Sequence, residues 1–117
     1  MKLIKKASEQ EKEIRKNMRG GEGEVTIRHY FKKDEINASC RLCAQLVIPP
    51  GAGIGRHEHA GEDEIFIIQR GRALITCDDR EEQVGPGDSI LTGKGESHSI
   101  RNKGDEDLLI TAVIMRY

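Results

Sequence analysis

The sequence predicts an all-β domain, a sandwich or barrel built from short strands. After residue 24, apolar and polar residues alternate, so that Val25, Ile27 and Phe31 would share one face of a strand. Turn-forming groups rich in Gly, Pro and Asp interrupt this alternation at short intervals. Many short strands with turns at this spacing are typical of β-sandwiches and β-barrels.

The beginning of the chain holds the one good helix candidate. Ser8-Glu-Gln-Glu11 has the pattern of a capping box, in which Ser8 caps a helix and Glu11 reaches back to it. The residues that follow are polar except for Ile14, so this short helix would lie on the surface, and a group of glycines ends it. We therefore expect an N-terminal helical extension over residues 1–20 and a β-domain over residues 21–117.

Turn signals divide the rest of the chain into predicted strands. Pro49-Pro50-Gly51 ends the longest one, and Arg70-Gly71-Arg72 is a hairpin corner between two others. The segments that we expect to be strands are Val25–Phe31, Ser39–Ile48, Ile65–Gln69, Ala73–Cys77, a short polar segment ending at Val84, Ser89–Thr92, Ser97–Asn102 and Leu108–Met115.

Size and charge limit the partners that we expect. A chain of 117 residues forms one domain with a modest core. Small domains commonly bury further surface by self-association, so we expect a homodimer. The net charge is -1, and the chain has two Tyr, two Phe and no Trp, so neither a basic face nor stacking aromatics indicate a nucleic-acid partner. No apolar segment reaches the length of a membrane span and no signal-peptide core is recognisable. We therefore expect no membrane partner and a cytoplasmic location.

Cys40 and Cys43 form a C-x-x-C pattern, which is typical of redox pairs and of half of a zinc site. No second C-x-x-C completes a four-sulfur site, and residues three apart on a strand face opposite sides. We therefore interpret Cys40, Cys43 and Cys77 as small buried apolar residues.

Three of the four histidines and one glutamate indicate a metal site. His57 and His59 are two residues apart, so on a strand they leave the same face, about 7 Å apart at the backbone. Glu64 opens the next apolar segment, and His98 lies on a later predicted strand. Three imidazoles and a carboxylate suit Mn, Fe, Co, Ni, Cu or Zn. Zinc could close the site at four ligands, whereas a six-coordinate ion would keep two neighbouring positions for water or substrate.

Two patterns around these residues resemble the two motifs of the cupin superfamily. The first is Gly51-x5-His57-x-His59-x4-Glu64-x6-Gly71, which agrees with the family motif at every defined position. The second is Gly87-x5-Gly93-x-Gly95-x2-His98-x3-Asn102. Its one departure is Gly93, where the family usually has a proline that would fix the turn. The patterns span residues 51–102, close to half of the chain.

The resemblance implies a double-stranded β-helix, a jelly-roll barrel that holds one divalent transition metal per chain inside its wider end. Carried over position by position, the metal ligands are His57, His59, Glu64 and His98. Mn, Fe or Ni are favoured by the resemblance, and Zn stays open. Small proteins similar to this one are typically homodimers that exchange N-terminal strands, a role that we expect for residues 23–31.

The same resemblance leaves two classes of function open. The first hypothesis is a metal-dependent enzyme of the decarboxylase, dioxygenase or isomerase type. Its substrate would be a small oxygen-rich molecule, such as a carboxylate, a keto-acid or a sugar derivative, that chelates the ion. The second is a module that binds a sugar or another small ligand, or senses it, without catalysis. Fold alone does not choose between them.

Three further residues near the expected ligands bear on the chemistry. Glu62 lies between His59 and Glu64 and is the candidate catalytic acid or base, the alternative being a solvated acid of a loop. Phe66 and Ile68 share a strand face with Glu64. They would line the floor of the cavity or simply pack in the core.

Overall fold

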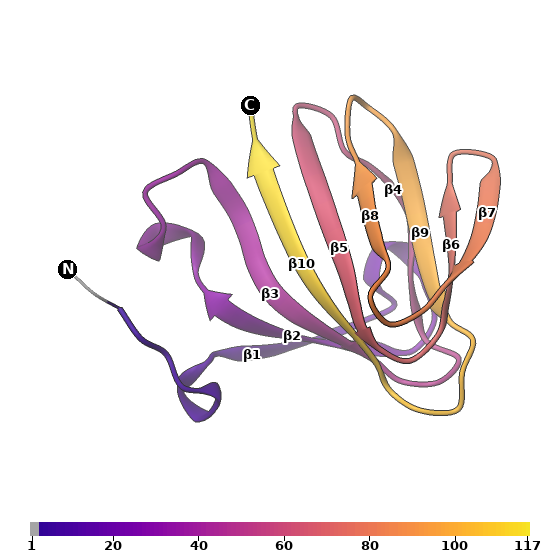
Figure 1. The fold of residues 1–117 in the computed structure, drawn as a ribbon, viewed down its shortest axis with the longest axis horizontal. Helices are drawn as coiled ribbons and strands as arrows, with labels where there is room; N and C mark the ends of the chain where they lie inside the picture. The colour runs from indigo at the N-terminus through magenta and orange to yellow at the C-terminus, as the bar shows by residue number, and fades with distance from the viewer. Residues whose placement is uncertain (1–2) are drawn as a thin grey trace.

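The computed structural model describes residues 3–117, which form two antiparallel β-sheets packed face to face (Figure 1). The strands are β1 Lys12–Lys16, β2 Glu24–Phe31, β3 Cys40–Ile48, β4 Gly53–Glu58, β5 Glu62–Arg70, β6 Ala73–Cys77, β7 Arg80–Val84, β8 Ser89–Thr92, β9 Ser97–Asn102 and β10 Leu108–Arg116. One sheet has the order β1-β2-β3-β10-β5-β8 and the other the order β4-β9-β6-β7. The predicted all-β jelly-roll barrel is confirmed.

The helical segments of the described chain are three 3-10 turns. They are η1 Ala7–Glu9, η2 Met18–Gly20 and η3 Lys33–Glu35. Within residues 3–117, no helix has the length and apolar character that a membrane span needs.

The predicted N-terminal helix is wrong. Ser8 lies inside the turn η1 instead of capping a helix, and the segment after it is strand β1, which pairs antiparallel with β2. Ile14 is the only large apolar residue of this segment, so a helix there would have no apolar stripe to bury, whereas pairing at the sheet edge satisfies its backbone. The division of the chain at residue 20 stays a prediction, although β1 belongs to the same sheet as β2.

The core lies between the two sheets, and the alternation along each strand selects its residues. On β10, Leu108, Ile110 and Ala112 are buried, whereas Leu109 and Thr111 face outward. Burial of the apolar surface between the sheets is the main favourable contribution to folding, at about 25 cal/mol per Å². The cluster comprises Val25, Ile27, Ala44, Leu46, Ile48, Ala52, Ile54, Phe66, Ile68, Ala73, Ile75, Ile100, Leu108, Ile110 and Ala112.

Asn102 fixes the turn between β9 and β10. Its Nδ2 donates to the carbonyl oxygens of Ile48, at 2.7 Å, and Glu106, at 2.8 Å, while its Oδ1 accepts from the amide of Gly104 at 2.8 Å. The side chain is buried, and of its three bonds the one to Ile48 is fully shielded from water. They hold the far end of the strand that carries His98.

The three cysteines are free. Cys40, Cys43 and Cys77 are half-buried, so their interpretation as buried apolar residues holds only in part. Burial raises the pKa of the thiols of Cys43 and Cys77, which keeps these two groups protonated at neutral pH.

Candidate metal centre

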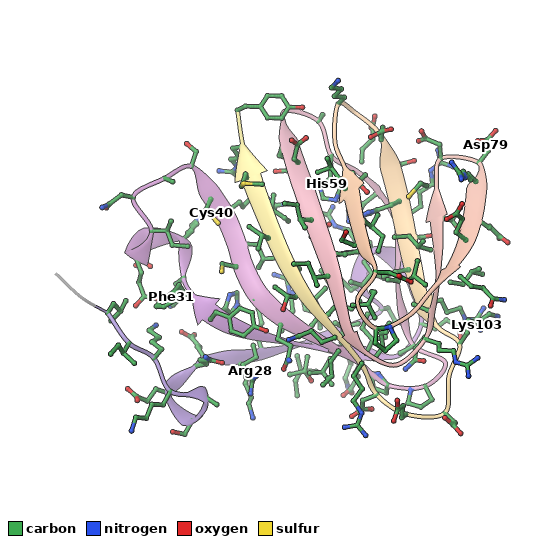
Figure 2. The ribbon with its side chains drawn as sticks, in the orientation of Figure 1. Arg28, Phe31, Cys40, His59, Asp79 and Lys103 are labelled. Carbon is green, nitrogen blue, oxygen red and sulfur yellow. The ribbon has the colours of Figure 1, made fainter. Side chains whose placement is uncertain are left out.

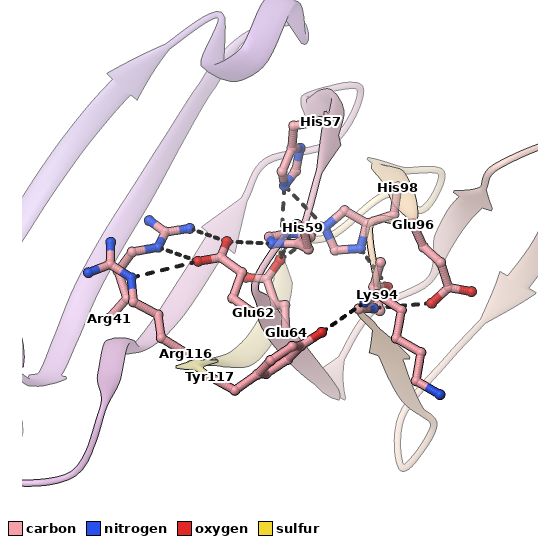
Figure 3. Close-up of polar contacts among 12 residues, drawn as sticks. Arg41, His57, His59, Glu62, Glu64, Lys94, Glu96, His98, Arg116 and Tyr117 are labelled. Atoms are coloured by element: carbon pink, nitrogen blue, oxygen red, sulfur yellow. Dashed lines mark hydrogen bonds and ion pairs between the residues drawn. The ribbon is translucent and has the colours of Figure 1, made fainter.

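Four side chains from three strands and one turn converge inside the barrel (Figure 3). His57 lies on β4 opposite His98 of β9, with which it is in register. His59 follows the end of β4, and Glu64 lies on the inward face of β5. Figure 2 places His59 among the side chains between the sheets, and only 1% of it is exposed. One ligand atom from each of the four lies within 4.8 Å of the other three, as the sequence predicted.

The potential ligand atoms face a single point. His98 Nε2 lies 2.9 Å from His59 Nε2 and 3.1 Å from His57 Nε2. Glu64 Oε1 lies 2.9 Å from both His59 Nε2 and His98 Nε2, and 4.0 Å from His57 Nε2. Three nitrogens and one carboxylate oxygen are thus gathered in a space that is closed on most sides by protein.

For His57 and His59, the contact made by Nδ1 shows which ring nitrogen carries the proton and which one carries the lone pair. His57 Nδ1 lies 2.8 Å from the carbonyl oxygen of Gly55, which can only accept, so Nδ1 carries the proton. His59 Nδ1 lies 2.8 Å from the carboxylate of Glu62 and is a donor for the same reason. The Nε2 atoms of these two rings therefore present lone pairs to the centre.

This arrangement fits a cation. Lone pairs that face one another and a carboxylate repel unless a positive charge lies between them. Glu64 Oε1 is buried, and none of its contacts with the imidazoles has hydrogen-bond geometry. With metal–ligand bonds of ~2.1 Å, neighbouring ligands of an octahedral ion are ~3.0 Å apart and opposite ligands ~4.2 Å apart, whereas tetrahedral ligands are ~3.4 Å apart. The observed separations of 2.9–3.1 Å, with 4.0 Å between His57 and Glu64, are of the size that ligands of a single ion have, so the four atoms could hold one metal ion.

Glu64 is ionised in this setting. Burial raises the pKa of its carboxyl, but the contacts with His57, His59 and His98 outweigh burial and hold the pKa well below its usual range. The carboxylate in turn raises the pKa of His59, whereas burial lowers the pKa of His98. A buried anion beside three imidazoles is the donor set that a divalent transition metal requires.

The family profile of the cupin domain matches residues 44–114. The chain belongs to the cupin family. All four converging residues lie within the matched segment, so the resemblance inferred from the sequence motifs is confirmed.

Two comparisons each give a match from Thermotoga maritima that extends over almost the whole of both chains. A protein described as "Oxalate-binding protein" is 39% identical over 113 residues, which are 97% of this chain and 93% of that protein. A crystal structure of "a predicted oxalate decarboxylase" superposes with a TM-score of 0.93 at 38% identity, over 98% of this chain and 100% of the other. The polyketide cyclase RemF of Streptomyces resistomycificus has a TM-score of 0.80 at 19% identity, over 99% and 80% of the two chains. That last match shows the shared fold.

Glu62 of this cupin lies behind His59 and is paired with an arginine. Arg41 on β3 donates from Nε to Glu62 Oε2 at 3.0 Å and from Nη2 to Glu62 Oε1 at 2.9 Å. This pair lowers the pKa of Glu62 to about 2, and the bond to His59 acts in the same direction. Glu62 opens β5 and its side chain is only 12% exposed, so the alternative of a solvated loop acid is wrong.

The sequence offered no signal for Arg41 or for Thr92. Thr92 Oγ1 lies 2.9 Å from His98 Nδ1, and both residues are buried. Phe66 stacks on His98 with the ring centres 5.0 Å apart and the planes 12° from parallel, so it packs against a candidate ligand. These two contacts hold the ring of His98 and leave its Nε2 facing the centre.

A cavity of about 80 Å³ adjoins the four residues. The apolar part of its lining consists of Leu46, Ile54 and Phe66, and the polar part includes His57, His59 and Glu64. Ile68 does not line the cavity and packs in the core. The volume corresponds to a few water molecules, since each takes roughly 30 Å³ in the liquid. It is well below the roughly 300 Å³ at which pockets for larger ligands begin.

Proposed function

We propose that this cupin holds one divalent transition metal through His57, His59, Glu64 and His98, and that the metal binds a small chelating carboxylate of the oxalate type. The observation that carries the proposal is the convergence of three imidazole nitrogens and one buried carboxylate oxygen within 4.8 Å of one another, a donor set that would hold a divalent transition metal. When bound, the metal supplies a Lewis acid that polarises ligand oxygens. The match to a protein described as oxalate-binding supports the same ligand class.

Cavity size favours a short acid over a sugar. A cavity of about 80 Å³ has room for a two-carbon or three-carbon acid, whereas a hexose derivative would have to extend into the mouth. Among the metals that this donor set suits, Mn, Fe or Ni stay favoured by the resemblance to cupins, and zinc stays open.

Decarboxylation of such an acid is the second candidate function, and it needs a group that moves a proton. Glu62 stays the candidate from the sequence. With a pKa of about 2 it is ionised at neutral pH, so it would begin as a base. Its oxygens are occupied by Arg41 and His59, which favours binding over catalysis.

The experiment that tests the proposal loads the purified protein with Mn²⁺, measures the bound metal by elemental analysis, and titrates oxalate, pyruvate and glucose 6-phosphate by calorimetry. We expect one Mn²⁺ per chain and the tightest binding for oxalate. The His59→Ala variant should lose both metal and oxalate binding, because it removes a buried ligand. Formate and CO₂ released from oxalate would identify a decarboxylase, and stable binding without product a binding protein. Oxalate binding by a metal-free His59→Ala protein would contradict the proposal.

A further inference from the structure

The mouth of the cavity is formed by the N-terminal segment, which the sequence assigned to a surface extension. Glu13 and Arg15 on β1 and Arg19 in η2 line the same cavity as His57, His59 and Glu64. Register explains how β1 reaches it, because Glu13 and Arg15 pair with Ile27 and Val25, whose side chains point into the core. The segment thus adds charged groups to a pocket whose floor is apolar.

Close packing of two backbones holds Arg19 at this mouth. A Cβ on Gly55 of β4 would collide with the carbonyl oxygen of Arg19, and a Cβ on Gly21 would collide with the carbonyl oxygen of Gly53. Arg19 itself has φ +53°, a left-handed conformation that residues other than glycine rarely adopt. The carbonyl oxygen of Gly55 also accepts a hydrogen bond from His57 Nδ1, so the strand against which η2 packs, β4, also orients a candidate metal ligand.

The three arginines that line the cavity differ in whether their guanidinium groups already pair with a carboxylate. Arg41 is committed to Glu62 through two short hydrogen bonds. Arg15 contacts Glu13 at 3.4 Å, and Glu13 also bonds to His29 at 2.9 Å. Among the residues that the structure describes, the guanidinium of Arg19 has neither a hydrogen bond nor an ion pair, although it lines the cavity. Its donors are therefore free for a ligand.

We propose that Arg15 and Arg19 recognise the outward-facing carboxylate oxygens of the metal-bound ligand and make the site selective for a small dianion. This rests on the proposed function. A divalent metal, Arg15 and Arg19 exceed the negative charges of Glu13 and Glu64 by two, a charge that a dicarboxylate would balance. A two-carbon dicarboxylate that chelates through one oxygen of each carboxylate leaves two oxygens for guanidinium groups, which bind such oxygens in a fork geometry. A keto-acid with one carboxylate offers only one charge.

The test compares oxalate with pyruvate on Mn²⁺-loaded proteins carrying Arg15→Gln, Arg19→Gln or both. Arg56→Gln is the matched control, because Arg56 is exposed like Arg15 and Arg19 and precedes His57 in the sequence, but does not line this cavity. We expect each cavity variant to weaken oxalate binding about 10- to 100-fold, the usual effect of losing a charge-assisted bond, and to weaken pyruvate much less. Mn²⁺ affinity should not change, and Arg19→Lys should restore part of the oxalate affinity. The control should behave like the wild-type protein.

Several outcomes would overturn the inference while leaving the proposed function intact. Wild-type oxalate affinity in both single variants and the double variant would show that the arginines are ordinary surface groups. Equal losses for oxalate and pyruvate, or a loss matched by Arg56→Gln, would show general attraction of anions instead of recognition. A fall in Mn²⁺ affinity equal to the fall in oxalate affinity would show that Arg19 acts only through His57. If the wild-type protein takes up Mn²⁺ but does not bind oxalate, the proposed ligand and this inference both fail.

Discussion

Glu62 shows how a residue outside the ligand set can govern the metal centre. Its carboxylate accepts the proton of His59 Nδ1 and is itself held by Arg41. A carboxylate in this position fixes the orientation of the ring and makes its other nitrogen more basic. The chain Arg41–Glu62–His59 therefore links strand β3 to the candidate centre.

Replacement of Glu62 by glutamine should weaken metal binding about 10- to 100-fold, because the amide no longer carries the charge that supports His59 and leaves Arg41 without its partner. Competition with a chelator at neutral pH measures this change. Glu58→Gln is the control, since Glu58 lies on β4 next to His57 but is exposed. Equal metal affinity in the two variants would show that Glu62 has no part in holding His59.

The Arg41–Glu62 pair also makes stability depend on pH. The pKa of Glu62 falls from 4.5 to about 2 on folding, so the pair stabilises the folded state fully above the higher value and loses its effect as the pH falls toward the lower one. In the metal-free protein, Glu62→Gln should lower the free energy of unfolding by about 1–3 kcal/mol at neutral pH. Urea unfolding between pH 7 and about pH 2 should show this difference shrinking. A difference that stays constant over the range would contradict the assignment.

At the scale of elements, most strands could be predicted from the sequence, whereas β4 (Gly53–Glu58) was not among the predicted segments and the N-terminal segment was predicted wrongly. Alternation and turn residues placed Ala73–Cys77, Ser89–Thr92 and Ser97–Asn102 at the observed bounds, because a half-buried strand needs an apolar residue at every second position. Residues 12–16 lack that signal, and their conformation is decided by the pairing of β1 with β2. The capping-box pattern at Ser8 is local and therefore led to the wrong prediction of an N-terminal helix.

The candidate ligands could be predicted because their spacing is local, whereas their supporting residues depend on the order of strands. His57 and His59 share a face by periodicity alone. Arg41 reaches Glu62 only because β3 and β5 flank β10 in the sheet, an order that alternation does not reveal. Arg19 reaches the cavity only through the packing of η2 on β4.

The departure from the second family motif has a structural reason. A Cβ at position 93 would meet the carboxylate of Asp63, the end of a flexible side chain that would have to move aside. The amide of Gly93 also donates to Glu96 Oε1 at 3.1 Å, a bond that proline could not make. The turn before His98 is therefore held by a hydrogen bond in place of a proline ring.

On the scale of the whole molecule, the outer face of the six-stranded sheet carries several apolar side chains although it faces solvent. Ile67, Leu91 and Met115 are exposed on neighbouring strands, and Ile65 and Val113 lie half-buried between them. Such a face is uncharged and can pair with its own copy about a two-fold axis, and a small domain gains core by doing so. The segment expected to be exchanged between subunits, residues 23–31, includes β2, which here pairs with β3 of its own chain. Strand exchange therefore stays a prediction, and we propose that a homodimer would use this outer face.

Ile67→Lys should therefore convert a dimer into a monomer while leaving metal binding unchanged, because it places a charge in the centre of the face and lies on the side of β5 away from Glu64. Sedimentation velocity across a range of concentrations measures the mass, with Glu58→Lys on the other sheet as the control. A wild-type protein that is monomeric throughout, or a dimer that survives Ile67→Lys, would rule this face out.

The four candidate ligands do not belong to one sheet. Glu64 comes from the six-stranded sheet, whereas His57 and His98 come from the four-stranded one. An ion held by all of them would link the two sheets. Because the ion would bind the folded chain and not the unfolded one, it would also shift the folding equilibrium toward the folded state. The concentration of free metal would then determine how stable the folded barrel is, as well as how much of the protein carries metal.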